Sequence, residues 1–223
     1  MLLQHPPHIT HPPLSNHRTI FYNLERATPF AQSPNVSNLI GLRPGQPVGN
    51  WRDSNEGLGY GFYPFDVNTA LVPASLRATQ VLLAAGLLNF ARAALDADAL
   101  DAVAGVWEAR APALFEVRVG GTEAEARLRG FVQAANLSAA LLQANSSAGG
   151  GSGSGSGSGN VSFYALSLME DGTPVEVLNS DTSFNLVYGA NVSREFLQHV
   201  VDALQPYPRG KLGLVERSAV HPC

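Results

Sequence analysis

The chain of 223 residues is long enough to fold as one large domain or two small ones. Only 14% of its residues are charged, and a formal charge of -4 with a pI near 5.8 gives no electrostatic basis for binding nucleic acid or an anionic membrane. The composition, with 45% apolar residues, is globular, and no apolar run reaches the length of a membrane span, so we expect neither a nucleic-acid nor a membrane partner.

Residues 1–17 are rich in proline and histidine, and His5, His8 and His11 recur at every third position. Metal binding is one interpretation of that spacing. Proline, however, prevents the helix that would align the imidazoles. We therefore predict a disordered leader with no metal site, and we expect no cofactor.

Apolar residues at helical spacing dominate the middle of the chain and predict a mainly α fold. An amphipathic helix is expected up to Pro29, and Asp98 is a candidate N-cap of a later helix. The helix after Pro73 is apolar almost all round, so we expect it to be buried. The predicted helices cover residues 18–30, 73–88, 89–95 and 100–111, and a further one begins at Thr122.

The last third of the chain begins with an almost pure Gly/Ser stretch, residues 148–159, which we expect to be a flexible insertion. Two strand-like runs, residues 163–168 and 175–178, then flank a turn sequence and predict a small β-hairpin. Ser193 is expected to cap a final helix, and residues 210–223 form an irregular tail.

Five Asn-x-Ser sequons suggest passage through a secretory pathway, although the amino terminus has no signal-peptide pattern. The single cysteine, Cys223, does not settle the compartment. N-glycans are expected as a possibility at Asn35, Asn136, Asn145, Asn160 and Asn191.

Residues 49–76 concentrate the chemistry of the chain. Trp51, Arg52 and three carboxylates, those of Asp53, Glu56 and Asp66, share this segment with several aromatic rings and closely spaced glycines. Aromatic rings stack on the apolar faces of sugars, and carboxylates bind hydroxyls and transfer protons. The segment therefore predicts a carbohydrate site. It lacks the strand and helix that would make its glycines a phosphate-binding loop.

Within this segment, the run NWRDS followed by FYPFDVNTALVPASLRA resembles the six-hairpin glycosidase superfamily, the (α/α)6 toroids that include glucoamylases and the glucosidase domain of glycogen debranching enzymes. The later run FYALSLMEDGTPVEVLNSDTSF also looks like segments of uncharacterised fungal members. The resemblance implies a partial (α/α)6 toroid over residues 18–209, interrupted by the Gly/Ser insertion.

The activity that the resemblance implies is inverting hydrolysis of glucosidic linkages, with one carboxyl as general acid and a second as general base. Asp53 would be the general acid, and Glu56 is a weaker catalytic candidate. The expected substrate-binding residues are Trp51, Arg52, Tyr63, Asp66 and Asn68.

Other interpretations of the same residues remain open. Asp53 is also suited to pairing with Arg52, and Asp66 and Asn68 stand where a helix is expected to begin, so capping competes with hydroxyl binding. No motif identifies the catalytic base, and a full toroid needs a longer chain. We therefore expect a fragment or truncated form, and the alternative function is a non-catalytic carbohydrate-binding or structural fragment of a larger glycosidase-like protein.

Overall fold

A computed structural model describes residues 14–46, 48–88, 95–143, 161–190, 192–194, 196–198 and 200. This part of the chain is mainly helical, as the sequence predicted, and it contains two small antiparallel sheets where the sequence predicted a single β-hairpin. None of its helices is long and apolar enough to cross a membrane. The predictions for residues 1–13, 89–94, 148–159 and 210–223 lie outside the described residues, as does most of the helix predicted after Ser193.

The elements follow one another along the chain, with helices first and most strands late. The helices are α1 (Leu14–Gln32), η1 (Val36–Asn38), η2 (Val67–Leu71), α2 (Val72–Ala84), α3 (Ala97–Leu114), α4 (Gly121–Ala134), α5 (Ala140–Gln143) and α6 (Thr182–Tyr188). The strands are β1 (Tyr63–Pro64), β2 (Glu116–Val119), β3 (Val161–Tyr164), β4 (Ser167–Leu168) and β5 (Pro174–Val175).

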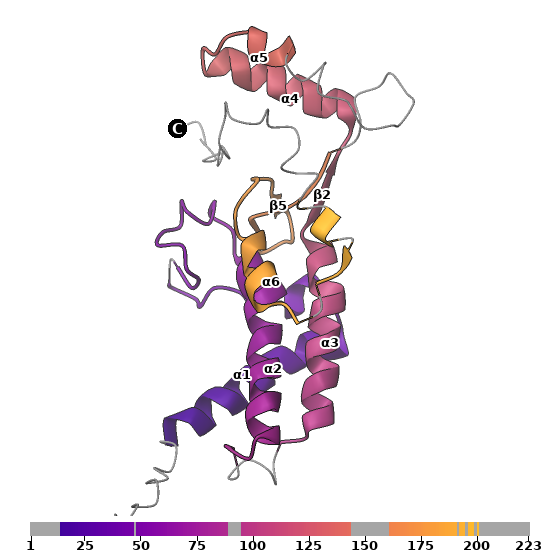
Figure 1. The fold of residues 1–223 in the computed structure, drawn as a ribbon. Coiled ribbons are helices and arrows are strands. Elements are labelled where there is room, and N and C mark those ends of the chain that lie inside the picture. The colour runs from indigo at the N-terminus through magenta and orange to yellow at the C-terminus, as the bar shows by residue number, and fades with distance from the viewer. Residues whose placement is uncertain are drawn as a thin grey trace, which may run out of the picture.

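The body of the structure is an antiparallel hairpin of α2 and α3, crossed by α1 (Figure 1). Trp107 of α3 is fully buried, and its ring lies 4.2 Å from that of Phe30 in α1. The Trp107 indole N–H also donates to the Ala27 carbonyl at 2.9 Å. Because this contact holds the end of α1, Pro29 does not close the helix as the sequence predicted, and α1 continues to Gln32.

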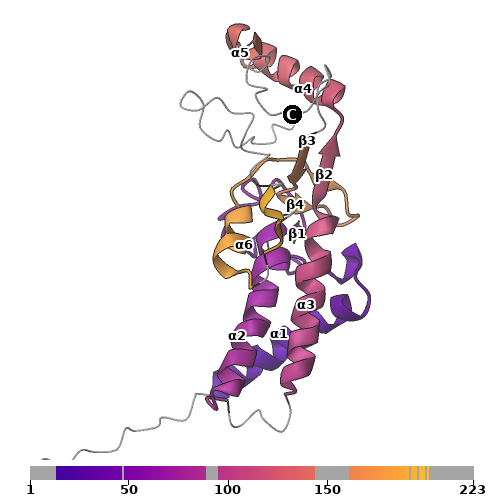
Figure 2. The same ribbon diagram turned by 45° about the vertical axis from the view of Figure 1, so that its right-hand side comes forward.

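The core continues from the helical hairpin into the sheets. Phe65 stands at the start of the helical segment that contains η2. Its ring makes an edge-to-face contact with Phe115 at 5.4 Å and a tilted contact with Tyr164 of β3 at the same distance. Leu168 of β4 is fully buried in the same cluster. These contacts attach both sheets to one end of the α2–α3 hairpin (Figure 2).

Two sheets share the segment that the sequence predicted as a single strand, residues 163–168. The first part of it belongs to β3, which pairs with β2, and the second part is β4, which pairs with both β1 and β5. The β4–β5 pair confirms the predicted hairpin, since Met169 N–H donates to the Thr173 carbonyl at 2.8 Å across the turn. The chain changes sheet at Ala165 and Leu166, which are buried.

Two helix details differ from the sequence prediction. Asp96, and not Asp98, caps α3, because its side chain accepts from the Asp98 N–H at 3.0 Å. The expected burial of the whole surface of the helix after Pro73 is wrong for its outer face, where Val81 is 66% exposed. The helix also ends at Ala84 and not at residue 88, so Leu87, 62% exposed, lies in the turn that follows it. Burial is limited to the stripe that contacts α1 and α3.

α4 lies away from the helical hairpin, beyond the β2–β3 pair (Figures 1 and 2). Most of its residues are exposed, and its arginines pair with glutamates one turn earlier, as in Arg127 with Glu123 at 2.8 Å. Gly121 and Val132 are buried, and Ala124 is half-buried against the core. α4 therefore contributes little to the core, and the described helices do not confirm a closed toroid.

Candidate functional site

The chemistry-rich segment folds as a turn-rich loop, residues 50–62, that projects beside α6 (Figure 1). Its glycines permit close packing: a Cβ on Gly61 would lie 1.9 Å from the Ser167 Oγ, and one on Gly59, where φ is +63°, would lie 2.6 Å from a Val175 methyl. The Ser167 hydroxyl also donates to the Leu58 carbonyl at 2.8 Å. The glycines thus attach the inner side of the loop to the β4–β5 hairpin and leave its outer side exposed.

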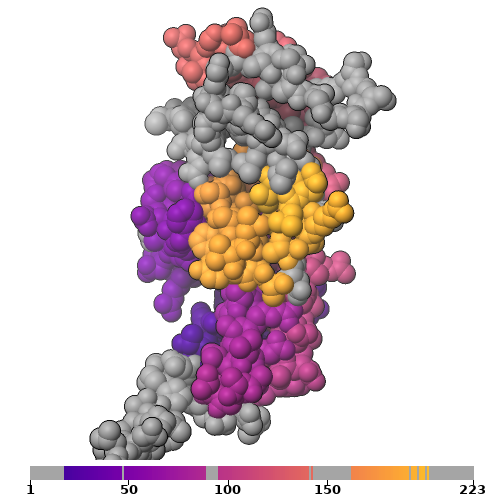
Figure 3. Space-filling view, in the orientation of Figure 1, coloured from indigo at the N-terminus to yellow at the C-terminus, as the bar shows by residue number. Residues whose placement is uncertain are grey.

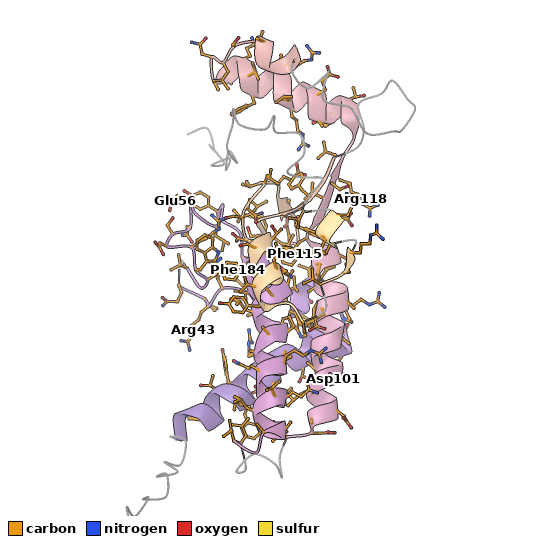
Figure 4. All side chains as sticks on the ribbon, viewed as in Figure 1. Arg43, Glu56, Asp101, Phe115, Arg118 and Phe184 are labelled. Atoms are coloured by element: carbon orange, nitrogen blue, oxygen red, sulfur yellow. The ribbon has the colours of Figure 1, made fainter. Side chains whose placement is uncertain are left out.

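Asp53, the predicted general acid, and Glu56, the weaker catalytic candidate, are both exposed on this loop. No hydrogen bond involves the Asp53 carboxylate in the described part of the chain. A backbone hydrogen bond and hydrogen bonds from Ser54 and Tyr60 lower the pKa of Glu56, which is therefore ionised at neutral pH. Figure 4 places Glu56 at the outer edge of the loop.

Tyr60 has a backbone conformation that bulky residues rarely adopt, with φ at +60°. Its ring is about half exposed, and its hydroxyl donates to Glu56 Oε1 at 3.2 Å. Strained residues of this kind are concentrated at functional sites. The conformation directs the ring of Tyr60 outward.

Arg52 joins the loop to α6. Its Nη2 donates to Asp181 Oδ1 at 2.7 Å and its Nε to Asp181 Oδ2 at 3.2 Å, while its Nη1 donates to the Gly57 carbonyl at 3.1 Å. The pair is largely dry, because the side chains of Arg52 and Asp181 are 10% and 0% exposed. Arg52 therefore pairs with Asp181. The alternative interpretation of the sequence, in which Arg52 pairs with the adjacent Asp53, is wrong.

Asp66 is fully buried beside this ion pair. Its Oδ1 accepts from Asn50 Nδ2 at 3.1 Å, whereas its Oδ2 has no hydrogen-bond partner among the described residues. Burial raises the pKa of Asp66, the hydrogen bond from Asn50 opposes that effect, and the charge of Asp181 adds to it. Asp66 and Asp181 are thus neighbouring carboxyls in different environments: Asp66 is hydrogen-bonded through one oxygen to a neutral amide, and Asp181 is paired with a guanidinium.

Asn68 and Tyr63 lie inside the protein. Asn68 uses both of its amide hydrogens and its oxygen, because Nδ2 donates to the carbonyls of Ile40 and Pro64 and Oδ1 accepts from the Ile40 N–H at 2.7 Å. Burial raises the pKa of Tyr63, and the charge of Glu170 adds to the effect. These contacts give both residues structural roles, and the substrate-binding roles of Tyr63, Asp66 and Asn68 stay predictions.

Asn68 and Thr69 also explain the single π-helical turn, η2, at the start of α2. The Asn68 amide donates to the Pro64 carbonyl at 2.8 Å and the Thr69 hydroxyl to the Phe65 carbonyl at 2.9 Å, so side chains satisfy backbone acceptors of the widened turn. Thr69 is also held by Asn185 of α6, whose Nδ2 donates to the Thr69 carbonyl at 3.0 Å. Turns of this type are frequent at functional sites.

Trp51, Phe184 and Tyr188, which we call the aromatic row, lie along the boundary between the loop and α6. The ring of Phe184 is 5.8 Å from that of Trp51 and 6.0 Å from that of Tyr188. Trp51 is 49% and Tyr188 51% exposed, and the Arg52 guanidinium lies 4.9 Å from the Trp51 ring centre. Figure 3 shows the loop and α6 side by side at the surface, and Figure 4 places Phe184 on the side of α6 that faces the loop.

A cavity of about 580 Å³ lies on the other side of Tyr188, between α2, α3 and α6. Its walls include Pro73 and Ala109, together with the ion pair of Arg77 and Glu108, whose closest atoms are 2.9 Å apart. Neither Trp51, Arg52, Asp53 nor Glu56 lines it. The structure thus separates the predicted loop site from this cavity, and Tyr188 belongs to both the aromatic row and the cavity wall.

Sequence reasoning missed the residues of α6 and of the cavity. Asp181 lies 129 positions from Arg52, and Asn185 lies 116 positions from Thr69, so no local pattern links either pair. The acidic residue in NSDTSF was the one available signal, and it was equally compatible with a turn cap. Among the described residues, no group of three or more His, Cys, Asp or Glu side chains is placed to hold a metal ion.

Comparison of this chain with protein-family models, with curated proteins and with solved structures gives no match.

Proposed function

We propose that this protein binds a neutral carbohydrate on the aromatic row, with the exposed face of Trp51 as the main platform. The observation that carries the proposal is that the indole is 49% exposed although its neighbour Arg52 is fixed in a dry bidentate ion pair. A rigidly positioned, exposed aromatic ring provides a large contact area at a low cost in conformational entropy. Sugars present apolar C–H faces that suit such a ring.

Polar groups at the edge of the row suit the hydroxyls of a sugar. The Asp53 carboxylate is exposed next to Trp51, and the ionised Glu56 and the Tyr60 ring lie farther along the same loop. Carboxylates accept hydrogen bonds from hydroxyls, and no charged ligand is required to satisfy them. The combination of exposed rings and nearby acceptors favours a neutral, polyhydroxylated ligand over an apolar one.

For the fold, we propose that the α2–α3 hairpin is one of the helical hairpins of an (α/α)6-type toroid. The support is the hairpin itself, together with exposed apolar side chains of α2, such as Val81 and Leu82. These are positions at which a neighbouring hairpin would pack. Under this proposal the chain is a partial form of a six-hairpin glycosidase, and N-glycans would mark its surface.

The second candidate function is inverting hydrolysis of glucosidic linkages, with Asp53 as general acid. The observation that favours it is that a second carboxylate, that of Glu56, is exposed three residues after Asp53 on the same loop and is the candidate for a base that activates water. Inversion needs the two carboxyl groups to be roughly 6.5 to 9.5 Å apart around the sugar. Under this proposal the exposed carboxyl groups of Asp53 and Glu56 would take positions on either side of a sugar bound at Trp51.

Binding and turnover measurements separate the two functions. Gluco-oligosaccharides are titrated into the full chain by calorimetry, and aryl glycosides are screened for hydrolysis. Binding that Trp51→Ala weakens at least about tenfold, equivalent to ~1.4 kcal/mol, supports the carbohydrate site. Hydrolysis that Asp53→Asn abolishes without loss of binding supports the enzymatic role, whereas wild-type turnover by Asp53→Asn contradicts it. Binding of no sugar at all contradicts both.

Asn35 and Asn136 are the sequons within the described residues. The Asn35 side chain is engaged by its own sequon, because the Ser37 hydroxyl donates to Asn35 Oδ1 at 2.6 Å. Asn136 is exposed just after α4, with φ at +51°. The sequons at Asn145, Asn160 and Asn191 lie outside the described residues, so glycosylation stays a proposal.

A further inference from the structure

The cavity beside α6 lies at the end of the aromatic row. Tyr188 stacks on Phe184 with an angle of 27° between the rings, and the same Tyr188 lines the cavity. The row therefore runs from Trp51 across α6 to the cavity wall. A ligand longer than the row would meet the cavity next.

The cavity has the size of a small-molecule site. Its volume of about 580 Å³ falls within the roughly 300 to 1,000 Å³ that is typical of ligand pockets. Small apolar residues, such as Ala74 and Pro73 from α2 and Ala109 and Pro112 from α3, give it smooth walls. Such walls accept the flat apolar face of a ring without steric conflict.

Polar groups in the cavity are held in fixed orientations. Arg77 of α2 and Glu108 of α3 form a bidentate pair, with Nε to Oε1 at 3.1 Å and Nη2 to Oε2 at 2.9 Å. Glu116 accepts two hydrogen bonds from Arg118, at 2.8 and 3.0 Å. The arginine partners thus fix the carboxylates of Glu108 and Glu116 in the cavity wall, where their planes keep a set orientation.

Aromatic rings complete the lining. Tyr164 and Phe196 are stacked with centroids 5.0 Å apart and an angle of 20° between their planes, and both line the cavity together with Tyr188. Rings and planar polar groups are thus combined here, as they are on the outer row. Planar carboxylates and guanidinium groups match pairs of adjacent hydroxyls.

From this arrangement we propose that the cavity is a second carbohydrate subsite, which takes the next sugar units of the chain bound on the aromatic row. The inference rests on the proposed function and goes further, because it makes the ligand an oligosaccharide that passes over Tyr188. Trp51 holds the near end of the oligosaccharide, and the Arg77–Glu108 pair faces the far end. Affinity must then increase with chain length.

The test fills the cavity without touching the row. Ala109→Phe and Ala74→Phe place a ring in the cavity from opposite walls, and both positions have side chains that are not fully buried. Ala99→Phe on α3, an exposed position that does not line the cavity, is the matched control. Calorimetric titration of each full-length variant uses glucose and the linear gluco-oligosaccharides of two to six units.

The expected result is that wild type and Ala99→Phe bind longer oligosaccharides more tightly, step by step, until both subsites are filled. Ala109→Phe and Ala74→Phe bind the shortest ligands with wild-type Kd but gain nothing with further length. The cavity is not a subsite if the affinity of wild type does not increase with oligosaccharide length, or if Ala109→Phe and Ala74→Phe both keep the wild-type increase. Either result leaves sugar binding on the aromatic row intact. If wild type binds no oligosaccharide of any length, the proposed sugar site on the aromatic row is contradicted as well.

Discussion

Replacing Asp66 with Asn is expected to stabilise the protein at neutral pH. Asp66 is fully buried, and its Oδ2 has no hydrogen-bond partner among the described residues. A buried polar group without a partner costs about 1 to 3 kcal/mol, and more when it is charged. Asn has the same shape, can still accept from Asn50 through its oxygen, and carries no charge beside Asp181. The Asn Nδ2 that replaces Oδ2 has no partner either, so the gain comes from removing the buried charge. The free energy of unfolding at neutral pH should therefore increase by about 1 to 3 kcal/mol.

The sign of the pH dependence follows from the raised pKa of Asp66 in the folded state. The folded protein holds the Asp66 proton at pH values where the unfolded chain, with a pKa near 3.9, has lost it. The stability that the protonated carboxyl contributes is therefore fully present below about pH 4 and is lost as the pH rises through the folded pKa. The advantage of Asp66→Asn should be largest at neutral pH and should decrease towards pH 4.

Thermal and urea unfolding of wild type and Asp66→Asn at pH 7.5 and pH 4.5 tests this reasoning. For a chain of this size, 1 kcal/mol corresponds to about 2 to 4 °C in Tm. Asp53→Asn, at an exposed position on the neighbouring loop, is the control and should change stability by less than about 0.5 kcal/mol. The reasoning is refuted if Asp66→Asn is less stable than wild type at pH 7.5, or if its difference from wild type is the same at both pH values.

Two further substitutions test the attachment of the loop. Arg52→Ala leaves the buried Asp181 carboxylate unpaired and should cost about 3 to 5 kcal/mol in urea unfolding, and a variant within 1 kcal/mol of wild type would show that the pair is not dry. Gly61→Ala places a methyl group 1.9 Å from the Ser167 Oγ and should lower Tm, whereas Gly130→Ala in α4, where a Cβ meets nothing within 4 Å, should raise stability by about 0.5 to 1 kcal/mol. Equal effects of the two glycine substitutions would contradict the close packing.

The sequence was sufficient for elements whose signals are local. The helix around Trp107 and the hairpin around Gly172 follow from periodicity and turn chemistry, and both were predicted. Burial was harder to predict. Val81 looks like a core residue in sequence but is exposed, because which face of a helix is covered depends on neighbours that are far away in the chain.

Of the candidate site, the sequence predicted the loop residues but not the residues of α6 that lie beside them. Residues 51–53 were chosen for their chemistry, and the structure places Trp51 on the surface as a stacking platform requires. The partner of Arg52, Asp181, is brought to it by the tertiary fold, and no spacing rule joins residues so far apart. The same holds for Tyr188, which links the aromatic row to the cavity.

Intrinsic fluorescence gives the most direct measurement of the central claim, because the chain has two tryptophans in opposite environments. Trp51 is 49% exposed, whereas Trp107 is fully buried and serves as an internal reference. Addition of a gluco-oligosaccharide should shift the wild-type emission with a saturable dependence on concentration, and Trp51→Phe, which keeps only Trp107, should show no shift. A saturable shift that survives in Trp51→Phe, or no shift in wild type at concentrations where calorimetry detects binding, would contradict a sugar site on Trp51.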